Sequence, residues 1–250
     1  MTLPPAFLTQ PLAHRGLHDL ARGVAENSRA AIRLAIDHGY GIEIDIQGSA
    51  DGEAMVFHDY ELKRLTGAKG FVRERTAAEL QKLTLSGGGE PPPTLAEVLD
   101  IVAGRAPLLI EIKDQSVRSL PTDGVLERRV ADLLAQYRGD VALMSFSPHS
   151  VAHCRDAAPD RPRGRTTCAF DEADWAFIPE ARRADLAKID DLEALGACFI
   201  SHDSADLDSA RVRRVRRTGY PVLTWTIKSA AQERAARAYA DNVTFEGYLA

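Results

Sequence analysis

The sequence is poor in cysteine, and its three cysteines lie far apart. Cys154, Cys168 and Cys198 form no Cys-x-x-Cys pair and no zinc-binding pattern. An odd number of widely spaced cysteines predicts reduced thiols that are buried as small apolar side chains. A disulfide framework is therefore not expected.

The sequence also lacks a basic excess. It has 31 Lys and Arg against 36 Asp and Glu, a formal net charge of -5, and no interleaving of basic with aromatic residues. A nucleic-acid partner is therefore not expected. The densest basic run, residues 211–217, is interrupted by Val212 and Val215. That spacing predicts an amphipathic helix with a solvated basic face rather than an anion-binding patch.

Long apolar runs are absent as well. The first 16 residues have no basic segment followed by an apolar core, so we expect no signal peptide. No apolar run approaches the length of about 20 residues that a membrane span needs. We expect a cytoplasmic protein without a membrane span. The composition leaves the oligomeric state open, a homo-oligomer included.

What is present is an alternation of strand-like apolar runs with helical segments. The chain has 250 residues, of which 45% are hydrophobic and 27% charged, as in ordinary globular proteins. The expected strands cover residues 11–15, 41–47, 107–113, 141–146, 163–169, 197–202, 220–227 and 242–245. Eight strands with intervening helices, in a chain of this length, predict a single-domain (β/α)8 TIM barrel over residues 1–250.

The alternation is interrupted after the second strand. Residues 60–93 are mixed and polar, include a short helix at 76–83, and end in a run of glycines and prolines. We interpret this segment as an insertion between barrel units. Thr94 and Glu97 then have the spacing of a capping box. Residues 171–194 show the weakest pattern, and we place a helix at 189–195.

The most informative stretch is residues 41–59, GIEIDIQGSADGEAMVFHD. Its isoleucines Ile42, Ile44 and Ile46 share one face of a strand, and Glu43 and Asp45 share the other. Inside a barrel, two carboxylates would lie about 7 Å apart along one strand in a poorly hydrated place. Such a pair is costly unless a cation or hydrogen bonds compensate it. The alternation therefore indicates a site.

Active sites of such barrels lie at the carboxyl ends of the strands. The polar or aromatic residues at the expected strand ends are His14, Arg15, Glu43, Asp45, His58, Asp59, Glu111, Lys113, His202, Asp203, Trp225 and Glu246. Glu43, Asp45 and Glu111 offer the oxygen ligands that Mg²⁺ and Ca²⁺ prefer. Arg15 and Lys113 add the positive charge that a phosphate needs. We therefore predict a divalent cation on the three carboxylates beside a phosphate site.

Histidines complete the predicted site. His14 and His58 come from different segments and can take and give a proton in one cycle, because imidazole titrates near neutrality. Trp225 is placed with the substrate-binding residues, and packing in the core is its alternative. His202 is interpreted as structural or at the rim, and His18 as a surface residue.

These residues carry a resemblance to a known family. The motifs are His14-Arg15-Gly16, Glu26-Asn27-Ser28, Glu43-Ile44-Asp45, Asp51-Gly52, His58-Asp59, Glu111-Ile112-Lys113, Ser145-Phe146 and Trp225-Thr226. In order and spacing they resemble the glycerophosphodiester phosphodiesterase family. The resemblance implies a phospholipase-C-like TIM barrel that hydrolyses glycerophosphodiesters, with metal assistance, to glycerol 3-phosphate and an alcohol. It also implies His14 and His58 as the acid/base pair, Glu43, Asp45 and Glu111 as metal ligands, and Arg15 and Lys113 as phosphate contacts.

The chain departs from the family pattern at three places. They are Ser49-Ala50 before the Asp-Gly turn, Ile227-Lys228 after Trp225-Thr226, and Thr244-Phe245-Glu246-Gly247 near the end. They leave the alcohol moiety of the substrate open. Two alternatives also remain: a non-catalytic barrel that binds phosphorylated ligands, and a phospholipase-D-like hydrolase of lysophospholipids. The second requires an apolar surface near the mouth of the barrel.

Overall fold

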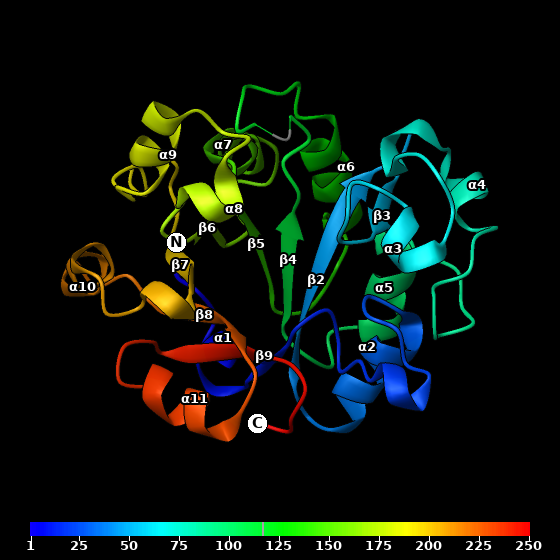
Figure 1. Cartoon of the computed structure of the whole chain (residues 1–250), viewed down its shortest axis with the longest axis horizontal. Helices are drawn as coiled ribbons and strands as arrows, with labels where there is room; N and C mark the ends of the chain where they lie inside the picture. Colours follow the sequence, from blue (N-terminus) through cyan, green and yellow to red (C-terminus); the bar gives the residue numbers. More distant parts are fainter. Residues whose placement is uncertain (117) are drawn as a thin grey trace.

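Eight parallel strands close into a barrel in the computed structural model, which describes residues 1–116 and 118–250 (Figure 1). The barrel strands are β1 (Leu12–Ala13), β2 (Gly41–Gly48), β4 (Leu108–Ile112), β5 (Val141–Ser145), β6 (Arg163–Thr167), β7 (Phe199–Asp203), β8 (Val222–Ile227) and β9 (Asn242–Phe245). Each pairs in parallel with its neighbours, and β1 closes the ring by pairing with both β2 and β9. The predicted TIM barrel is confirmed.

The strands are buried on both faces, as parallel barrel strands must be. Ile42 and Ile44 of β2 point outward into the main core, beneath the surrounding helices. Glu43 and Asp45 therefore point inward, and both are almost fully buried. The register of the parallel pair places Asp45 beside Glu111 of β4. The alternation seen in the sequence thus brings carboxylates together inside the barrel.

The other end of the barrel is filled by apolar side chains. Phe7 of α1 (Ala6–Thr9) packs there in one cluster with Leu12, Leu109, Phe199 and Leu223, and all five are fully buried. This packing seals the amino-terminal end of the barrel. Solvent reaches the polar interior from the carboxyl ends of the strands, where the sequence places its chemistry.

Helices surround the barrel and most begin at a capping hydroxyl. They are α2 (Arg29–Asp37), α5 (Leu95–Val102), α6 (Val125–Leu134), α7 (Pro148–Ala157), α8 (Glu172–Trp175), α9 (Glu180–Leu186), α10 (Ala210–Arg217) and α11 (Ala230–Ala236), with 3-10 turns η1 (Leu20–Arg22) and η3 (Ser204–Asp206). Ser28 caps α2, and Thr94 with Glu97 forms the predicted capping box of α5. Helix α10 is the predicted basic helix, and its Val212 and Val215 are buried.

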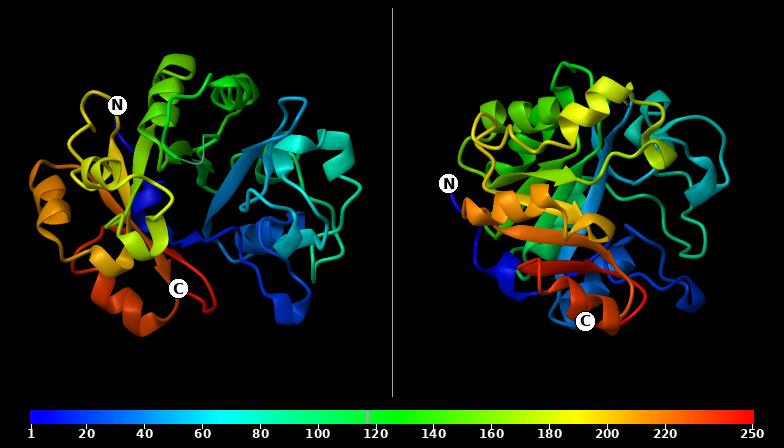
Figure 2. Two further views of the ribbon diagram at one scale, coloured as in Figure 1. Left: turned by 45° about the horizontal axis from the view of Figure 1, so that its top comes forward. Right: turned by 60° about the vertical axis from the view of Figure 1, so that its left-hand side comes forward.

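The segment after β2 forms a small unit beside the barrel. Strand β3 (Ala54–Val56) runs antiparallel to β2 and is followed by α3 (Lys63–Thr66), η2 (Val72–Glu74) and α4 (Ala77–Leu80). Its side chains form a separate apolar cluster that includes Met55, Phe57 and Leu62. Figures 1 and 2 show this unit, in cyan, on the opposite side of β2 and β4 from α8 and α9. The helix predicted at residues 76–83 is the shorter α4, with Thr76 as its cap.

One predicted helix is wrong. Residues 189–195 form no helix: residues 189–191 are irregular and residues 192–196 form a turn. Ile189 has a φ of 50°, which interrupts a right-handed helix. Asp191 is instead held by an ion pair with the fully buried Arg165 of β6. The spacing of the apolar residues is that of a helix, but the left-handed backbone at Ile189 is incompatible with one.

Two further expectations concern cysteines and membrane spans. Cys154, Cys168 and Cys198 are free and buried, as predicted. Among the residues that the structure describes, no helix combines the length and the apolar character needed to cross a bilayer.

Candidate active site

The first site residues lie where β1 ends after only two residues. Arg15 and Gly16 have φ values of 55° and 75°, so the chain turns away from the barrel directly after His14. A Cβ at Gly16 would lie 2.8 Å from the Cβ of Ala31 in α2. Only glycine fits this close approach. The turn thus holds His14 and Arg15 over the mouth of the barrel.

Three carboxylates lie inside the mouth. Glu43 and Asp45 of β2 and Glu111 of β4 are 2%, 1% and 6% exposed. Each offers an oxygen within 4.8 Å of the others. The backbone N–H of Arg15 donates to Glu43 Oε2 at 3.0 Å, and Asn27 Nδ2 donates to Asp45 Oδ2 at 3.0 Å. These bonds fix the orientation of the carboxylates.

Two cations face the carboxylates but leave them only partly neutralised. Lys113 Nζ lies 2.7 Å from Asp45 Oδ1 and 2.6 Å from Glu111 Oε1, and Arg15 Nε lies 3.4 Å from Asp45 Oδ2. Burial, together with Asp45 and Glu111, raises the pKa of Glu43 well above its usual range. Burial also acts to raise the pKa of Asp45, but Lys113, His58 and Arg15 hold it well below its usual range. The charged form of Glu43 is therefore disfavoured unless a further positive charge lies beside it.

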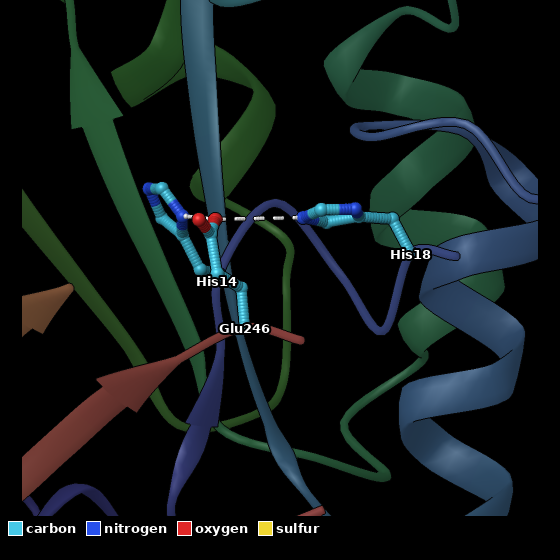
Figure 3. Close-up of side chains that lie close together, drawn as sticks. All are labelled: His14, His18 and Glu246. Carbon is cyan, nitrogen blue, oxygen red and sulfur yellow. Dashed lines mark hydrogen bonds and ion pairs between the residues drawn. The ribbon is translucent and has the colours of Figure 1, made fainter. Parts of the chain in front are cut away.

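His14 is held by a carboxylate from the far end of the chain. Its Nδ1 lies 2.6 Å from Oε2 of Glu246, which follows β9 (Figure 3). Burial lowers the pKa of His14, Glu246 offsets part of this effect, and Arg15 lowers the pKa further. Oε2 of Glu246 also lies 3.6 Å from His18 Nε2, and Lys228 Nζ lies 3.0 Å from its Oε1. Glu246 thus lies between two imidazole rings, as Figure 3 shows.

His58 has the same arrangement on the other side of the site. Its Nδ1 lies 2.7 Å from Asp59 Oδ1. Arg64 of α3 forms hydrogen bonds to both oxygens of Asp59 and to Glu26. Burial would raise the pKa of Asp59, but its bonds to His58 and Arg64 lower it far below its usual range. Asp59 therefore stays ionised and holds the ring of His58.

All eight residues predicted for the site line one cavity of about 80 Å³. They are His14, Arg15, Glu43, Asp45, His58, Glu111, Lys113 and Trp225. The indole of Trp225 lines this cavity while its Nε1 donates to the backbone oxygen of Ser201 at 3.0 Å. Trp225 therefore both lines the cavity and is held in place by the neighbouring strand, so the two interpretations of this residue are compatible.

Several neighbours of these residues escaped the sequence analysis. His18, interpreted as a surface residue, lies beside Glu246 instead, because the turn after β1 folds the chain back over the barrel mouth. Asn27 was noticed only as part of a motif, although it bonds Asp45. Glu246 was placed at a strand end without a partner. His202 is fully buried between Thr167 and Asp206, in agreement with a structural role.

Comparison with known proteins defines the class. Residues 14–244 match the Glycerophosphoryl diester phosphodiesterase family, which is nearly the whole chain. The chain therefore belongs to this family and is an enzyme of the glycerophosphodiester phosphodiesterase class.

Individual relatives agree with this assignment. YhdW of Bacillus subtilis (strain 168), provisionally named a glycerophosphodiester phosphodiesterase, is 28% identical over 242 residues, which is 93% of this chain and 90% of YhdW. A glycerophosphodiester phosphodiesterase of Caldanaerobacter subterraneus subsp. tengcongensis is 33% identical over 159 residues, which is 60% of this chain and 63% of that protein. An Oleispira antarctica phosphodiesterase, solved with sn-glycerol-3-phosphate as its product, shares the fold with a TM-score of 0.78 at 24% identity, covering 96% of this chain and 94% of that one.

Proposed function

We propose that the chain hydrolyses glycerophosphodiesters to glycerol 3-phosphate and an alcohol, with a divalent cation and a histidine acid/base pair. The observation that carries this proposal is the shared cavity of the eight predicted residues. Two histidines, three carboxylates and two cationic side chains border one space. The product found in the Oleispira antarctica phosphodiesterase, sn-glycerol-3-phosphate, has the chemistry that this site would release.

The three carboxylates fit a divalent cation. They are buried, and their oxygens lie within 4.8 Å of one another. Lys113 and Arg15 lie beside Asp45 and Glu111, so a bound cation would favour the charged form of Glu43. All-oxygen donor sets suit Mg²⁺ or Ca²⁺. When bound, the ion would polarise a phosphoryl oxygen and offset developing negative charge. His14, His18 and Glu246 also come within 4.8 Å of one another, but we assign the ion to the acidic trio, because His14 must stay free to exchange protons.

Arg15 and Lys113 would hold the phosphate. The guanidinium of Arg15 and the ammonium of Lys113 each already lie beside Asp45, so both cationic groups converge on one point of the cavity. Burial acts to lower the pKa of Lys113, but Asp45 and Glu111 raise it above its ordinary value, so the side chain stays charged. Fixed cations of this kind stabilise the charge that builds on phosphoryl oxygens in the transition state.

His14 and His58 would carry the protons. In each ring, Nδ1 is bound to a carboxylate, Glu246 for His14 and Asp59 for His58, which leaves Nε2 to face a substrate. One ring would accept the proton of the attacking hydroxyl, and the other would protonate the departing alkoxide. A carboxylate on the far nitrogen stabilises the imidazolium form that each ring passes through.

The test is turnover of glycerophosphocholine by the purified chain in Mg²⁺ or Ca²⁺, with His14→Ala, His58→Ala and His38→Ala variants. Loss of a general acid or base typically costs about 10²- to 10⁴-fold in kcat. We expect losses of that size in the first two variants. His38 is exposed at the end of α2 and serves as the control. A protein that binds glycerophosphocholine without releasing choline would instead be a phosphate-ligand-binding barrel.

A further inference from the structure

A second, much larger cavity opens from the polar centre. Its volume is about 1020 Å³, and it shares His58, Glu111, Lys113, Phe146 and Trp225 with the small cavity. Any ligand whose phosphate lies between Arg15 and Lys113 therefore has direct access to it. A volume of this size suits a ligand much larger than glycerol or choline.

One side of the large cavity is built from aromatic rings. This aromatic wall consists of Phe146, Phe170, Trp175, Phe177 and Trp225. The rings form a continuous surface, because neighbouring centroids lie 4.9 to 5.6 Å apart along the series from Phe170 through Trp175 to Phe177, and 5.6 Å separate Phe146 from Trp225. Ile178 and Leu186 extend it. Figure 1 shows that α8, which bears Trp175, and α9, which bears Leu186, lie on one side of the barrel mouth.

The opposite side of the cavity comes from the insertion. Phe71 and Val72 face the cavity there, next to Tyr60 and the basic residues Arg64 and Arg73. Phe71 and Phe177 are both large apolar side chains on the surface, 37% and 48% exposed. Apolar surface on both sides of a cavity is stabilised when it is covered by apolar ligand atoms.

The distribution of charge favours an apolar chain over a cationic head group. Among the described lining residues, the carboxylates are Asp59, Glu61, Glu111 and Asp114, and none belongs to the segments that form the aromatic wall. Asp59 is paired with His58 and Arg64, and Glu111 with Lys113. The wall is thus a long uncharged surface rather than an acidic cage.

We propose that the aromatic wall binds the acyl or alkyl chain of the substrate, so that phosphodiesters of glycerol bearing one apolar chain are preferred. This inference rests on the proposed function, since the same centre would cleave them. The diester plus water gives a phosphomonoester plus an alcohol: a new P–O bond forms, the P–O bond to the alcohol breaks, and the alkoxide takes a proton. The apolar chain of the substrate is attached either to the glycerol, as in a lysophospholipid, or to the leaving alcohol.

The experiment compares kcat/KM across two substrate series below their micellar concentrations. One series is glycerophosphocholine and its 1-butanoyl and 1-octanoyl esters. The other is the ethyl, butyl and octyl esters of glycerol 3-phosphate. We expect kcat/KM to rise about 10-fold or more from the shortest to the longest member of at least one series, because each buried methylene favours binding. The series in which kcat/KM rises with chain length shows whether the preferred apolar chain is on the glycerol or on the leaving alcohol.

Variants of the wall test the cause of that rise. Phe177→Asp places a charge on an exposed part of the wall, so the fold is preserved. Trp175→Ala removes a ring in the middle of it. Each should lower the ratio of kcat/KM for the octyl substrate to that for the shortest one by about 10-fold. Leu249→Ser, a substitution at a residue that is 64% exposed and outside the cavity, should leave the ratio unchanged.

Each negative result has its own meaning. If glycerophosphocholine is cleaved but neither series depends on chain length, the inference is overturned while the proposed function stands. If Trp175→Ala lowers kcat/KM equally for glycerophosphocholine and for the octyl substrate, the inference is also overturned, because the aromatic wall would then contact a part that both substrates share. No cleavage of any member would overturn the proposed function itself.

Discussion

Nδ1 of His14 and Oε2 of Glu246 lie 2.6 Å apart, although 232 positions separate the two residues in the sequence. His14 follows the first barrel strand and Glu246 follows the last. Glu246 in turn is held by Lys228, whose Nζ lies 3.0 Å from its Oε1. The histidine is therefore oriented by a residue that directly follows the closing strand of the barrel.

Replacing Glu246 with Gln should shift the pH profile of the enzyme. Glu246 raises the pKa of His14 against the effects of burial and Arg15, so its loss should lower that pKa. The limb of the kcat/KM profile that His14 controls should then move to lower pH, whichever proton-transfer role it has. Because a hydrogen bond to a charged group contributes about 1.5–3 kcal/mol, kcat should fall roughly 10- to 100-fold. The profiles of both enzymes would be measured between pH 4 and 9.

Glu53→Gln is the control for that experiment, since Glu53 pairs with Arg129 outside the site. It should leave both the profile and kcat unchanged. A Glu246→Gln enzyme with the wild-type profile would show that the carboxylate does not act on His14.

Metal binding should be visible as stabilisation. A ligand that binds only the native state at 100 times its Kd adds about 2.7 kcal/mol. For a chain of this length each kcal/mol moves Tm by roughly 2 to 4 °C, so millimolar Mg²⁺ or Ca²⁺ should raise Tm by about 5 to 10 °C over chelator. Glu43→Gln should raise Tm in chelator by relieving repulsion, and should abolish both the metal response and the activity. Thermal melts with and without metal measure this.

Glu127→Gln is a matched control. Glu127 is buried, and burial raises its pKa, but it lies in α6 away from the acidic trio. Its variant should keep the full metal response. Full wild-type activity in chelator, without a metal-dependent shift of Tm, would exclude the trio as a metal site.

The nucleophile can be identified with one analogue. In a glycerophosphodiester the glycerol 2-hydroxyl lies close to phosphorus, and proximity favours its attack, with water then opening the cyclic phosphate. The 2-deoxy analogue of glycerophosphocholine lacks that hydroxyl. We expect its turnover to fall by about 100-fold or more in a choline-release assay. Equal turnover of the two compounds would point to direct attack by water.

The ion pair of Arg165 with Asp191 should matter for stability. The side chain of Arg165 is completely buried, so removing its partner leaves a buried charge unpaired. Asp191→Asn should lower the free energy of unfolding by about 3 kcal/mol or more. Asp208→Asn, at the exposed pair with Arg213, should cost less than about 1 kcal/mol. Urea unfolding of both variants measures the free energy of unfolding, and an equal decrease in the two variants would contradict the prediction.

The sequence predicted the barrel because its strands carry a local signal. The alternation of Ile42 and Ile44 with Glu43 and Asp45 can be recognised from neighbouring residues alone, because strand side chains alternate with period two. Contacts that depend on distant segments left no such signal. The contact of Glu246 with His14 and the pair of Arg165 with Asp191 each join separate parts of the chain. The helix predicted at 189–195 is wrong because the spacing of apolar residues does not reveal the left-handed backbone at Ile189.

The short strand β1 also has a consequence for biosynthesis. It contacts β2, made soon after it, and β9, made after the other seven strands of the barrel. A growing chain can therefore bring Glu43 and Asp45 together long before His14 meets Glu246. Until Glu246 emerges from the ribosome, the site lacks one of its carboxylate–histidine pairs. Full activity should thus begin only after Glu246 has been made, and a chain cut before Glu246 should be far less active even where its remaining barrel folds.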